Sequence, residues 1–165
     1  PVDDLQDMWK HVARQYFDNR LPPIIIEWSF RLTASTGVFV SQVGPQSRIV
    51  SQEVRHGVAR RIRLSALLLA GQPETEIIGT LAHEMIHQWQ YDITKRFPNH
   101  GPDFLEIMDR MNVGGLGITV HHSLNQQVEQ LNKYLWRCLI VATRIDGSGE
   151  LFPRGVIGAG NVMGS

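Results

Sequence analysis

Two histidines and a glutamate in the pattern His-Glu-x-x-His, at His83, Glu84 and His87, are the residues of this sequence best suited to chemistry. On a helix, residues four apart lie one turn apart on the same face, so both imidazoles could bind one Zn²⁺ ion. Glu84 would lie on the adjoining flank, within reach of a water molecule on that ion. The pattern predicts metal-assisted hydrolysis with Glu84 as the catalytic base. The alternative is a surface helix with two solvent-facing histidines.

A catalytic zinc site of this kind needs a third protein ligand. His100 is the preferred candidate, because it lies in a segment of turn-forming residues that could return it to the metal. Asp103 and Glu106 compete with it, and His100 could also be an ordinary turn residue. The longer pattern His-Glu-x-x-His-x-x-Gly-x-x-His is absent, because Gln90 and Tyr91 occupy the region where its glycine would lie.

Hydrophobic periodicity predicts the elements that must position these residues. The helix that carries the histidines should begin near Pro73, with apolar positions up to Trp89. The other expected elements are helices over 5–17 and 102–111 and strands over 24–28, 36–40, 61–65 and 118–120. Together they predict an α+β fold, in which a small antiparallel or mixed sheet packs with about three to four helices.

The helical wheel of the central segment places the two histidines opposite the centre of its apolar arc. His83 and His87 share that side with Glu76, Thr80 and Tyr91. We therefore expect a helix that buries one side in the core and offers the other side to a cleft.

Length and composition narrow the class of protein. The chain has 165 residues, 42% hydrophobic and 19% charged, with no net charge, which fits one globular domain and excludes a strongly basic nucleic-acid wrapper. Its one cysteine, Cys138, excludes a disulfide scaffold and a cysteine-rich zinc finger. No apolar run approaches the roughly 20 residues that span a bilayer. We expect an intracellular protein without a membrane partner, and a monomer by default.

The sequence resembles the SprT-like, Spartan-type, metalloprotease family over about residues 3 to 138. In chain order, the motifs that carry the resemblance are Arg20-Leu21-Pro22, Glu27-Trp28-Ser29, Arg31-Leu32-Thr33, Gly37, Ile62-Arg63-Leu64-Ser65, Leu67-Leu68-Leu69, His83-Glu84-Met85-Ile86-His87, His100-Gly101-Pro102-Asp103-Phe104, Ile118-Thr119-Val120-His121-His122 and Trp136-Arg137-Cys138. In this order and together, they are far more specific than His-Glu-x-x-His alone.

The resemblance implies a zincin-like active-site helix and one catalytic Zn²⁺ ion held by His83, His87 and His100, with Glu84 as catalyst. It also implies a DNA-activated endopeptidase whose substrates are proteins covalently crosslinked to DNA. Its partners would then be protein substrates and single-stranded or junction-containing DNA. Such a protein would work in the nucleus of a eukaryote, or in the cytoplasm or nucleoid of a prokaryote.

The resemblance also divides the chain into a metalloprotease domain over 1–138 and a glycine-rich segment over 139–165. Many family members follow the Trp-Arg-Cys motif with a zinc-ribbon-like module that carries more cysteines. In this sequence Cys138 is the one cysteine, so the segment after it lacks that module. Cys138 itself is expected to be a small buried residue.

Basic residues near the third expected strand and the histidine loop are candidate DNA contacts. They are Arg55, Arg60, Arg61, Arg63, Lys95 and Arg96. Arginines at alternating strand positions share one face and could follow phosphates, although an ordinary solvated strand face is the alternative.

Two further residues could assist the reaction. His122 follows the expected strand 118–120, and Tyr91 shares the histidine side of the central helix. Either could stabilise the transition-state oxyanion, or orient a metal ligand from the second layer of contacts. His122 could instead be a polar strand end.

Two other functions remain open on the sequence alone. One is a general metallopeptidase without DNA dependence. The other is a DNA-binding or adaptor domain with an idle metal site, which a fourth protein ligand on the metal would favour.

Overall fold

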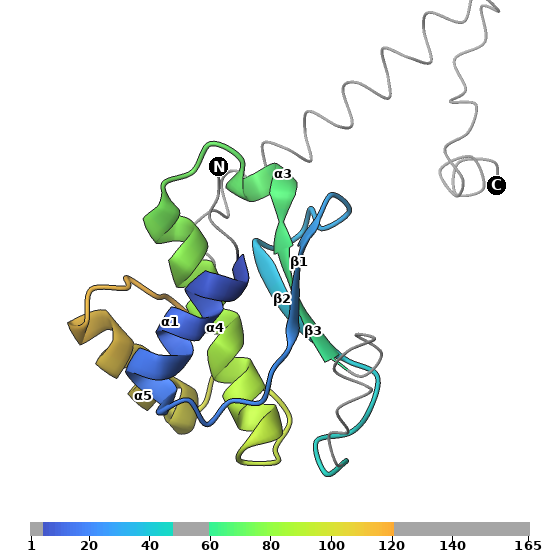
Figure 1. Ribbon diagram of the computed structural model, residues 1–165, viewed down its shortest axis with the longest axis vertical. Coiled ribbons are helices and arrows are strands. Elements are labelled where there is room, and N and C mark those ends of the chain that lie inside the picture. The colour runs from blue at the N-terminus through green and yellow to red at the C-terminus, as the bar shows by residue number, and fades with distance from the viewer. Residues whose placement is uncertain (1–4, 48–59, 121–165) are drawn as a thin grey trace, which may run out of the picture. The chain divides into compact units, whose positions relative to one another are not determined.

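The computed structural model describes residues 5–47 and 60–120. These residues contain four helices and three strands (Figure 1). In chain order they are α1 (Leu5–Phe17), β1 (Ile25–Ser29), β2 (Gly37–Ser41), β3 (Arg60–Ser65), α3 (Ala66–Leu69), α4 (Glu74–Asp92) and α5 (Pro102–Val113). His122, Arg55, Cys138 and the segment 139–165 lie outside the described residues.

The three strands form one mixed sheet in the order β1-β3-β2, which confirms the predicted α+β class. The strand β1 runs parallel to β3, and β2 runs antiparallel to it. Side chains alternate across a strand, so Ile62 and Leu64 of the central strand share one face while Arg61 and Arg63 share the other. Ile62 and Leu64 are fully buried and belong to the core, so that face is the one covered by the helices.

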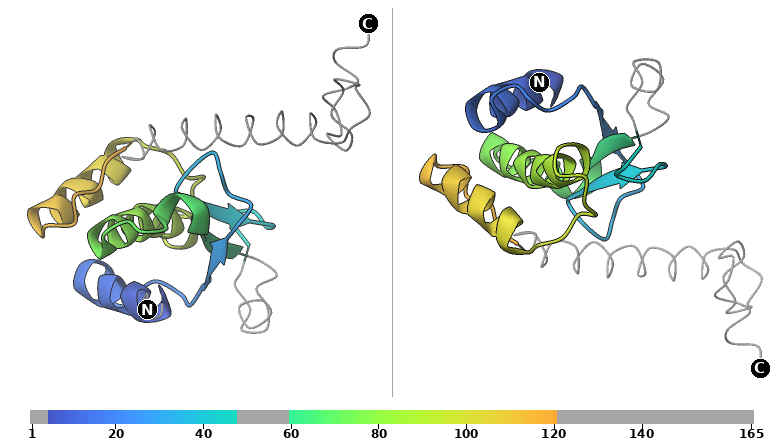
Figure 2. Two further views of the ribbon diagram at one scale, coloured as in Figure 1. Left: turned by 90° about the horizontal axis from the view of Figure 1, so that it is seen from above. Right: turned by 90° about the horizontal axis from the view of Figure 1, so that it is seen from below.

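The helices α1, α4 and α5 lie side by side on one face of the sheet, with α4 between the other two (Figure 2). The apolar stripe predicted for the first helix faces this core, where Trp9, Val12 and Phe17 are buried. Helix α4 contributes Leu81, Met85 and Ile86 to the same hydrophobic core, and none of the three has exposed surface. Because α4 has neighbours on several sides, its position relative to the sheet is set by packing rather than by one amphipathic stripe.

The helix α4 begins where its sequence predicts and is buried more completely than expected. Pro73 is its N-cap, and Glu74 and Glu76 lie in its first turn. His83 and His87 are only 4% and 8% exposed, although His83 lines a pocket together with Glu76 and Thr80 on the side where a cleft was expected. The chain after α4 turns back, with Lys95 at a φ of +58°, and brings residues 96–100 over this side.

The predicted strand over 118–120 is not a strand. Both backbone polar groups of Ile118 bind the side chain of Asn112 at the end of α5. The amide of Ile118 donates to Asn112 Oδ1 at 2.5 Å, and its carbonyl accepts from Asn112 Nδ2 at 2.8 Å. β-branched residues suggested a strand here, but a helix-end asparagine satisfies the backbone that a sheet partner would otherwise have bound.

The short helix α3 was not expected from hydrophobic periodicity. Ser65, the last residue of β3, is its N-cap, and the serine hydroxyl accepts from the amide of Leu68 at 3.1 Å. This cap turns the chain directly from the sheet into a single helical turn. None of the helices described is long and apolar enough to cross a membrane.

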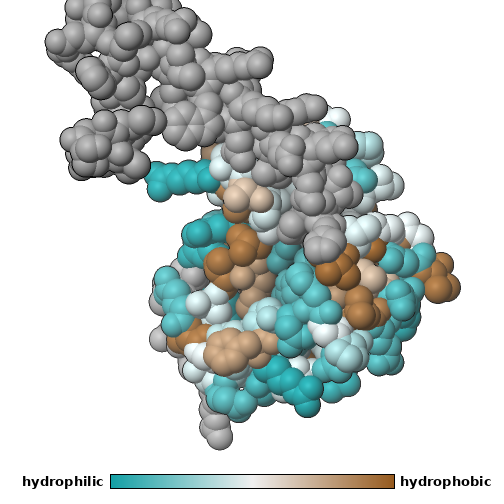
Figure 3. All heavy atoms as spheres, turned by 180° about the vertical axis from the view of Figure 1, so that it is seen from behind, coloured by the Kyte–Doolittle hydropathy of each residue, from teal (hydrophilic) through white to brown (hydrophobic). Residues whose placement is uncertain are grey.

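In the part of the chain that the structure describes, the three most exposed large hydrophobic residues come from different elements. Phe30, Phe97 and Val113 are 74%, 71% and 92% exposed, and they lie after β1, after α4 and at the end of α5. On the face seen from behind, hydrophobic groups are set among hydrophilic ones (Figure 3). Single exposed apolar residues of this kind are ordinary for a globular surface.

Candidate metal centre

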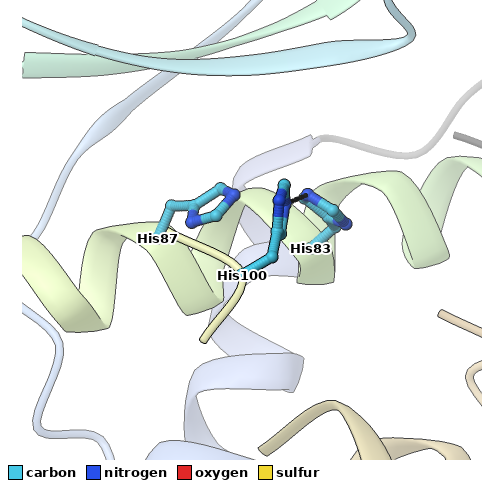
Figure 4. Close-up of side chains that lie close together, drawn as sticks. All are labelled: His83, His87 and His100. Atoms are coloured by element: carbon cyan, nitrogen blue, oxygen red, sulfur yellow. Dashed lines mark hydrogen bonds between the residues drawn. The ribbon is translucent and has the colours of Figure 1, made fainter. Parts of the chain in front are cut away.

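Three histidines converge on one point beside α4 (Figure 4). His83 and His87 stand one turn apart on the helix, and His100 reaches between them from the loop before α5. One nitrogen from each ring can be chosen so that all three lie within 4.8 Å of one another. Nε2 of His100 is 3.1 Å from Nε2 of His83. Among the residues described, this is the one group of histidines, cysteines and carboxylates close enough to hold a metal.

The two competing candidates for a third ligand lie elsewhere. Asp103 and Glu106 line a separate pocket with Tyr16 and Trp89, between the end of α1 and the first turns of α5. The geometry therefore favours His100 over both carboxylates.

Carbonyl acceptors fix the orientation of both helix histidines. Nδ1 of His83 is 2.9 Å from the carbonyl oxygen of Thr119, and Nδ1 of His87 is 3.0 Å from Oε1 of Gln90. A carbonyl oxygen can only accept, so each Nδ1 donates, and in the neutral imidazole each Nε2 then keeps its lone pair. Neutral imidazoles held in this way are suited to bind a cation.

Phe104 forms an apolar floor beneath the three rings. It comes from α5 and has no exposed surface. Its ring centre lies 4.9, 5.0 and 4.7 Å from those of His83, His87 and His100. The phenyl ring holds the imidazoles in place and excludes water from that side of the site.

Glu84 points from α4 toward the edge strand β2 and is only 3% exposed. Burial raises the pKa of its carboxyl group to about 8, while a backbone hydrogen bond from Phe39 acts in the opposite direction. Gly37, also in β2, leaves room for this side chain, since a Cβ there would come within 3.1 Å of Glu84 Cγ and 2.8 Å of Thr80 Cγ2. The carboxyl group is thus held in a dry gap between helix and sheet.

A pocket of about 200 Å³ opens beside His83. One wall is the first half of α4, including Glu76 and Thr80, and the other is the segment 115–119 that follows α5. The pocket adjoins the histidine cluster through His83, so it has room for part of a polypeptide bound at the cluster.

Tyr91, which the helical wheel suggests as a residue that assists the reaction, makes structural contacts through its hydroxyl and its ring. The residue is 6% exposed, and its hydroxyl donates a hydrogen bond to the carbonyl of Val43. Its ring packs against Phe39 and Phe97, with centroids 5.3 and 6.3 Å away. Tyr91 therefore ties the loop after β2 to the end of α4.

The basic residues predicted to contact DNA lie in different environments. Arg60 is buried and forms an ion pair with Asp92, so the expectation that it contacts DNA is wrong. Arg61 and Arg63 do share the outer face of the sheet, but both pair with Glu27, at 3.0 and 2.8 Å.

The other two described basic residues lie near the histidine loop. Lys95 is half-buried, and Arg96 is exposed and pairs with Asp103 at 3.3 Å. Arg55 and the possible oxyanion donor His122 lie outside the described residues.

Sequence reasoning missed four contributors to this site: Gln90, Phe104, the carbonyl of Thr119 and the backbone of Phe39. Gln90 could have been found, because it follows His87 by three positions and so lies on a neighbouring part of the same helix surface. Phe104 follows His100 by four residues, whereas the carbonyl of Thr119 and the backbone of Phe39 come from distant segments that no local spacing indicates.

A small α+β domain with His-Glu-x-x-His on a helix and a third histidine after it is the architecture of a zincin-like metalloprotease. The SprT-like family model matches residues 5–122. The chain belongs to the SprT-like family.

The curated relatives are long proteins with similar names. The chain is 33% identical to the DNA-dependent metalloprotease SPRTN of Homo sapiens over 141 residues, which cover 84% of this chain and 26% of that protein. It is 32% identical to the DNA-dependent metalloprotease dvc-1 of Caenorhabditis elegans over 143 residues, which cover 84% of this chain and 36% of that protein. The zebrafish SPRTN is 32% identical, with 20% of its length covered. The chain thus spans about a third or less of these relatives.

Proposed function

We propose that this chain is a zinc-dependent endopeptidase domain that is activated by DNA and cuts proteins covalently crosslinked to DNA. The convergence of His83, His87 and His100 at α4, the helix that also carries the buried Glu84, is the observation that carries the proposal. The relatives' name, DNA-dependent metalloprotease, supports the dependence on DNA. The proposed activity belongs in the nucleus of a eukaryotic cell or the nucleoid of a prokaryotic one.

The donor set favours zinc at this centre. Three neutral imidazoles are ligands that zinc prefers, and three protein ligands leave a fourth position open, as catalytic sites require. Within residues 5–47 and 60–120, no further cysteine, aspartate or glutamate joins the three histidines. When bound, zinc would act as a Lewis acid toward the scissile carbonyl and lower the pKa of water.

Glu84 is the proposed proton carrier. Its carboxylate would take a proton from the attacking water and later deliver it to the amine that leaves. Burial raises the pKa of this carboxyl, and a cation bound by the neighbouring histidines would act in the opposite direction. The dry gap between α4 and β2 keeps the group from exchanging its proton with bulk water.

DNA would bind through the basic residues that stay near the surface. Arg61 and Arg63 lie on the outer face of the sheet, and Lys95 and Arg96 lie on the loop that leads to His100. The loop pair is closer along the chain to the proposed centre, so phosphate binding there could act directly on the position of His100. We propose both pairs as phosphate contacts.

The experiment that tests the proposal is digestion of a protein covalently attached to DNA. Zinc-loaded protein and Glu84→Gln are compared with and without single-stranded DNA, and bound zinc is measured in both. We expect cleavage by the unsubstituted protein, only with DNA, and a loss of rate on the order of 100-fold or more in Glu84→Gln with zinc retained.

Other outcomes would identify the alternatives. Equal cleavage without DNA would indicate a general metallopeptidase. Tight binding of DNA without cleavage of any protein would indicate an adaptor domain with an idle metal site.

A further inference from the structure

Gln90 is the most connected polar side chain next to the proposed metal centre. It lies on α4 three residues after His87 and is 2% exposed. Its Oε1 accepts from Nδ1 of His87 at 3.0 Å and from the amide of Asn99 at 3.1 Å. Its Nε2 donates to the carbonyl of Asn99 at 3.0 Å. One amide group therefore touches a helix histidine and the residue immediately before the loop histidine.

The segment around His100 is held on both sides by this arrangement. Gln90 binds the amide and the carbonyl of Asn99, much as a neighbouring strand would. The side chain of Asn99 then accepts from the amide of Gly101 at 2.8 Å. His100 lies between these two fixed points, so its backbone has little freedom to move away from α4.

We propose that Gln90 is a positioning residue that couples the tautomer of His87 to the placement of His100. By accepting the hydrogen bond from Nδ1–H, it leaves Nε2 of His87 free to bind a metal. By clamping Asn99, it brings the third histidine to the same point. The inference rests on the proposed metal site and adds to it the residue that assembles two of the three ligands.

Only an amide of this length meets both demands. The group must accept two hydrogen bonds through one oxygen and donate a third through nitrogen. A glutamate would keep the acceptor for His87, but it would lose the donor to the Asn99 carbonyl and place an oxygen against that carbonyl oxygen. A methionine would fill the same space and supply neither function.

Gln88 provides a matched control on the same helix. It is also a fully buried glutamine, but it binds Trp9 Nε1 at 3.0 Å and the carbonyl of Pro22 at 2.8 Å. No hydrogen bond joins its side chain to a histidine among the bonds described. Gln88→Met and Gln90→Met thus remove the same group from the same helix, one away from the centre and one beside it.

The test measures the zinc dissociation constant of both variants by competition with a chelator, together with unfolding of the metal-free proteins. We expect Gln90→Met to weaken zinc binding about 10- to 100-fold, the usual effect of losing a group that orients a ligand. Gln88→Met should lower the unfolding temperature and leave the zinc dissociation constant unchanged. Nitrogen NMR of His87 should show the Nδ1-protonated tautomer in the unsubstituted protein and a mixture in Gln90→Met.

Equal zinc affinity in Gln90→Met and the unsubstituted protein would overturn the inference, and so would equal weakening in both variants. If Gln90→Met fails to fold, Gln90→Glu decides, because it keeps the acceptor for His87 and loses the donor to Asn99. Weakened zinc binding by a folded Gln90→Glu supports the coupling, and unchanged binding overturns it. Absence of zinc binding by the unsubstituted protein would instead refute the proposed metal site.

Discussion

Arg60 and Asp92 form a buried ion pair that joins the first residue of β3 to the last residue of α4. Their side chains are 3% and 2% exposed. Asp92 also accepts from Nε2 of Gln88 at 3.2 Å. The pair therefore fixes the distal end of the helix that carries the proposed metal ligands.

Removing one member of this pair is expected to destabilise the fold strongly. In Asp92→Ala the guanidinium of Arg60 would be left buried without its carboxylate, which typically costs about 3–5 kcal/mol. Urea unfolding of the metal-free protein measures this cost. The double variant Arg60→Met with Asp92→Leu should recover much of it, because no uncompensated charge is buried. A cost well below about 1 kcal/mol for Asp92→Ala would mean that the pair is solvated in solution.

His100→Ala should lose most of the zinc affinity while leaving the helix intact. The loop histidine is exposed at the rim of the cluster, so its removal creates no cavity in the core. Bound zinc after dialysis and circular dichroism separate the two effects. Undiminished zinc content in this variant would return the third-ligand role to Asp103 or Glu106.

Gly37→Ala tests the close approach of β2 to α4. A Cβ at this position would come within 2.8 Å of Thr80 Cγ2 and 3.1 Å of Glu84 Cγ, so one of them must move. We expect a loss of about 1–3 kcal/mol in stability and reduced activity, because Glu84 would be displaced. Gly44→Ala is the control, since a Cβ there meets nothing within 4 Å. A neutral effect of Gly37→Ala on both stability and activity would contradict this packing.

Tyr91→Phe distinguishes a structural tyrosine from a catalytic one. Its hydroxyl donates to the carbonyl of Val43, so the substitution should cost about 1 kcal/mol of stability and leave kcat nearly unchanged. Thermal unfolding and peptide cleavage give the two values. A large fall in kcat with unaltered stability would restore Tyr91 as a group that assists the transition state.

The carboxylate shared by two arginines on the sheet predicts a pH dependence of stability. The hydrogen bond from Arg63 is the largest cause of a lowered pKa for Glu27, and Arg61 contributes in the same direction. A lowered pKa stabilises the fold above the unfolded value of about 4.3, and that stabilisation is lost as the pH falls through the lower folded value.

Glu27→Gln should therefore be less stable than the unsubstituted protein at neutral pH, by less than about 1 kcal/mol because the groups are partly exposed. The difference should disappear in acid. Denaturant unfolding at a series of pH values measures it, and a constant difference across the series would contradict the assignment.

The predictable part of the molecule was local. The first helix, the start of α4 at Pro73 and the strand with Ile62 and Leu64 follow from hydrophobic spacing within short windows. The pairing of His83 with His87 follows from the pitch of the helix. His100 followed from the turn-forming residues around it.

What escaped prediction depends on contacts between distant segments. Strand alternation puts Arg60 on the same face as Ile62 and Leu64, but only the structure supplies Asp92 as its partner. Ile118 is β-branched and resembles a strand residue, yet Asn112 satisfies its backbone. The burial of His83 and His87 depends on the chain after α4, which a helical wheel does not include.

The separation of these residues along the chain bears on the order in which the molecule assembles. His100 is 17 residues from His83, so the proposed ligand set closes a short loop, whose entropic cost is small. The Thr119 carbonyl that orients His83 is 36 residues away, and Phe39, which binds Glu84, belongs to a strand far upstream. Contacts between residues close in the sequence, such as His83 and His100, form faster than contacts between distant segments. During folding, we therefore expect α4 and its loop to bring the three histidines together before β2 shields Glu84 from water.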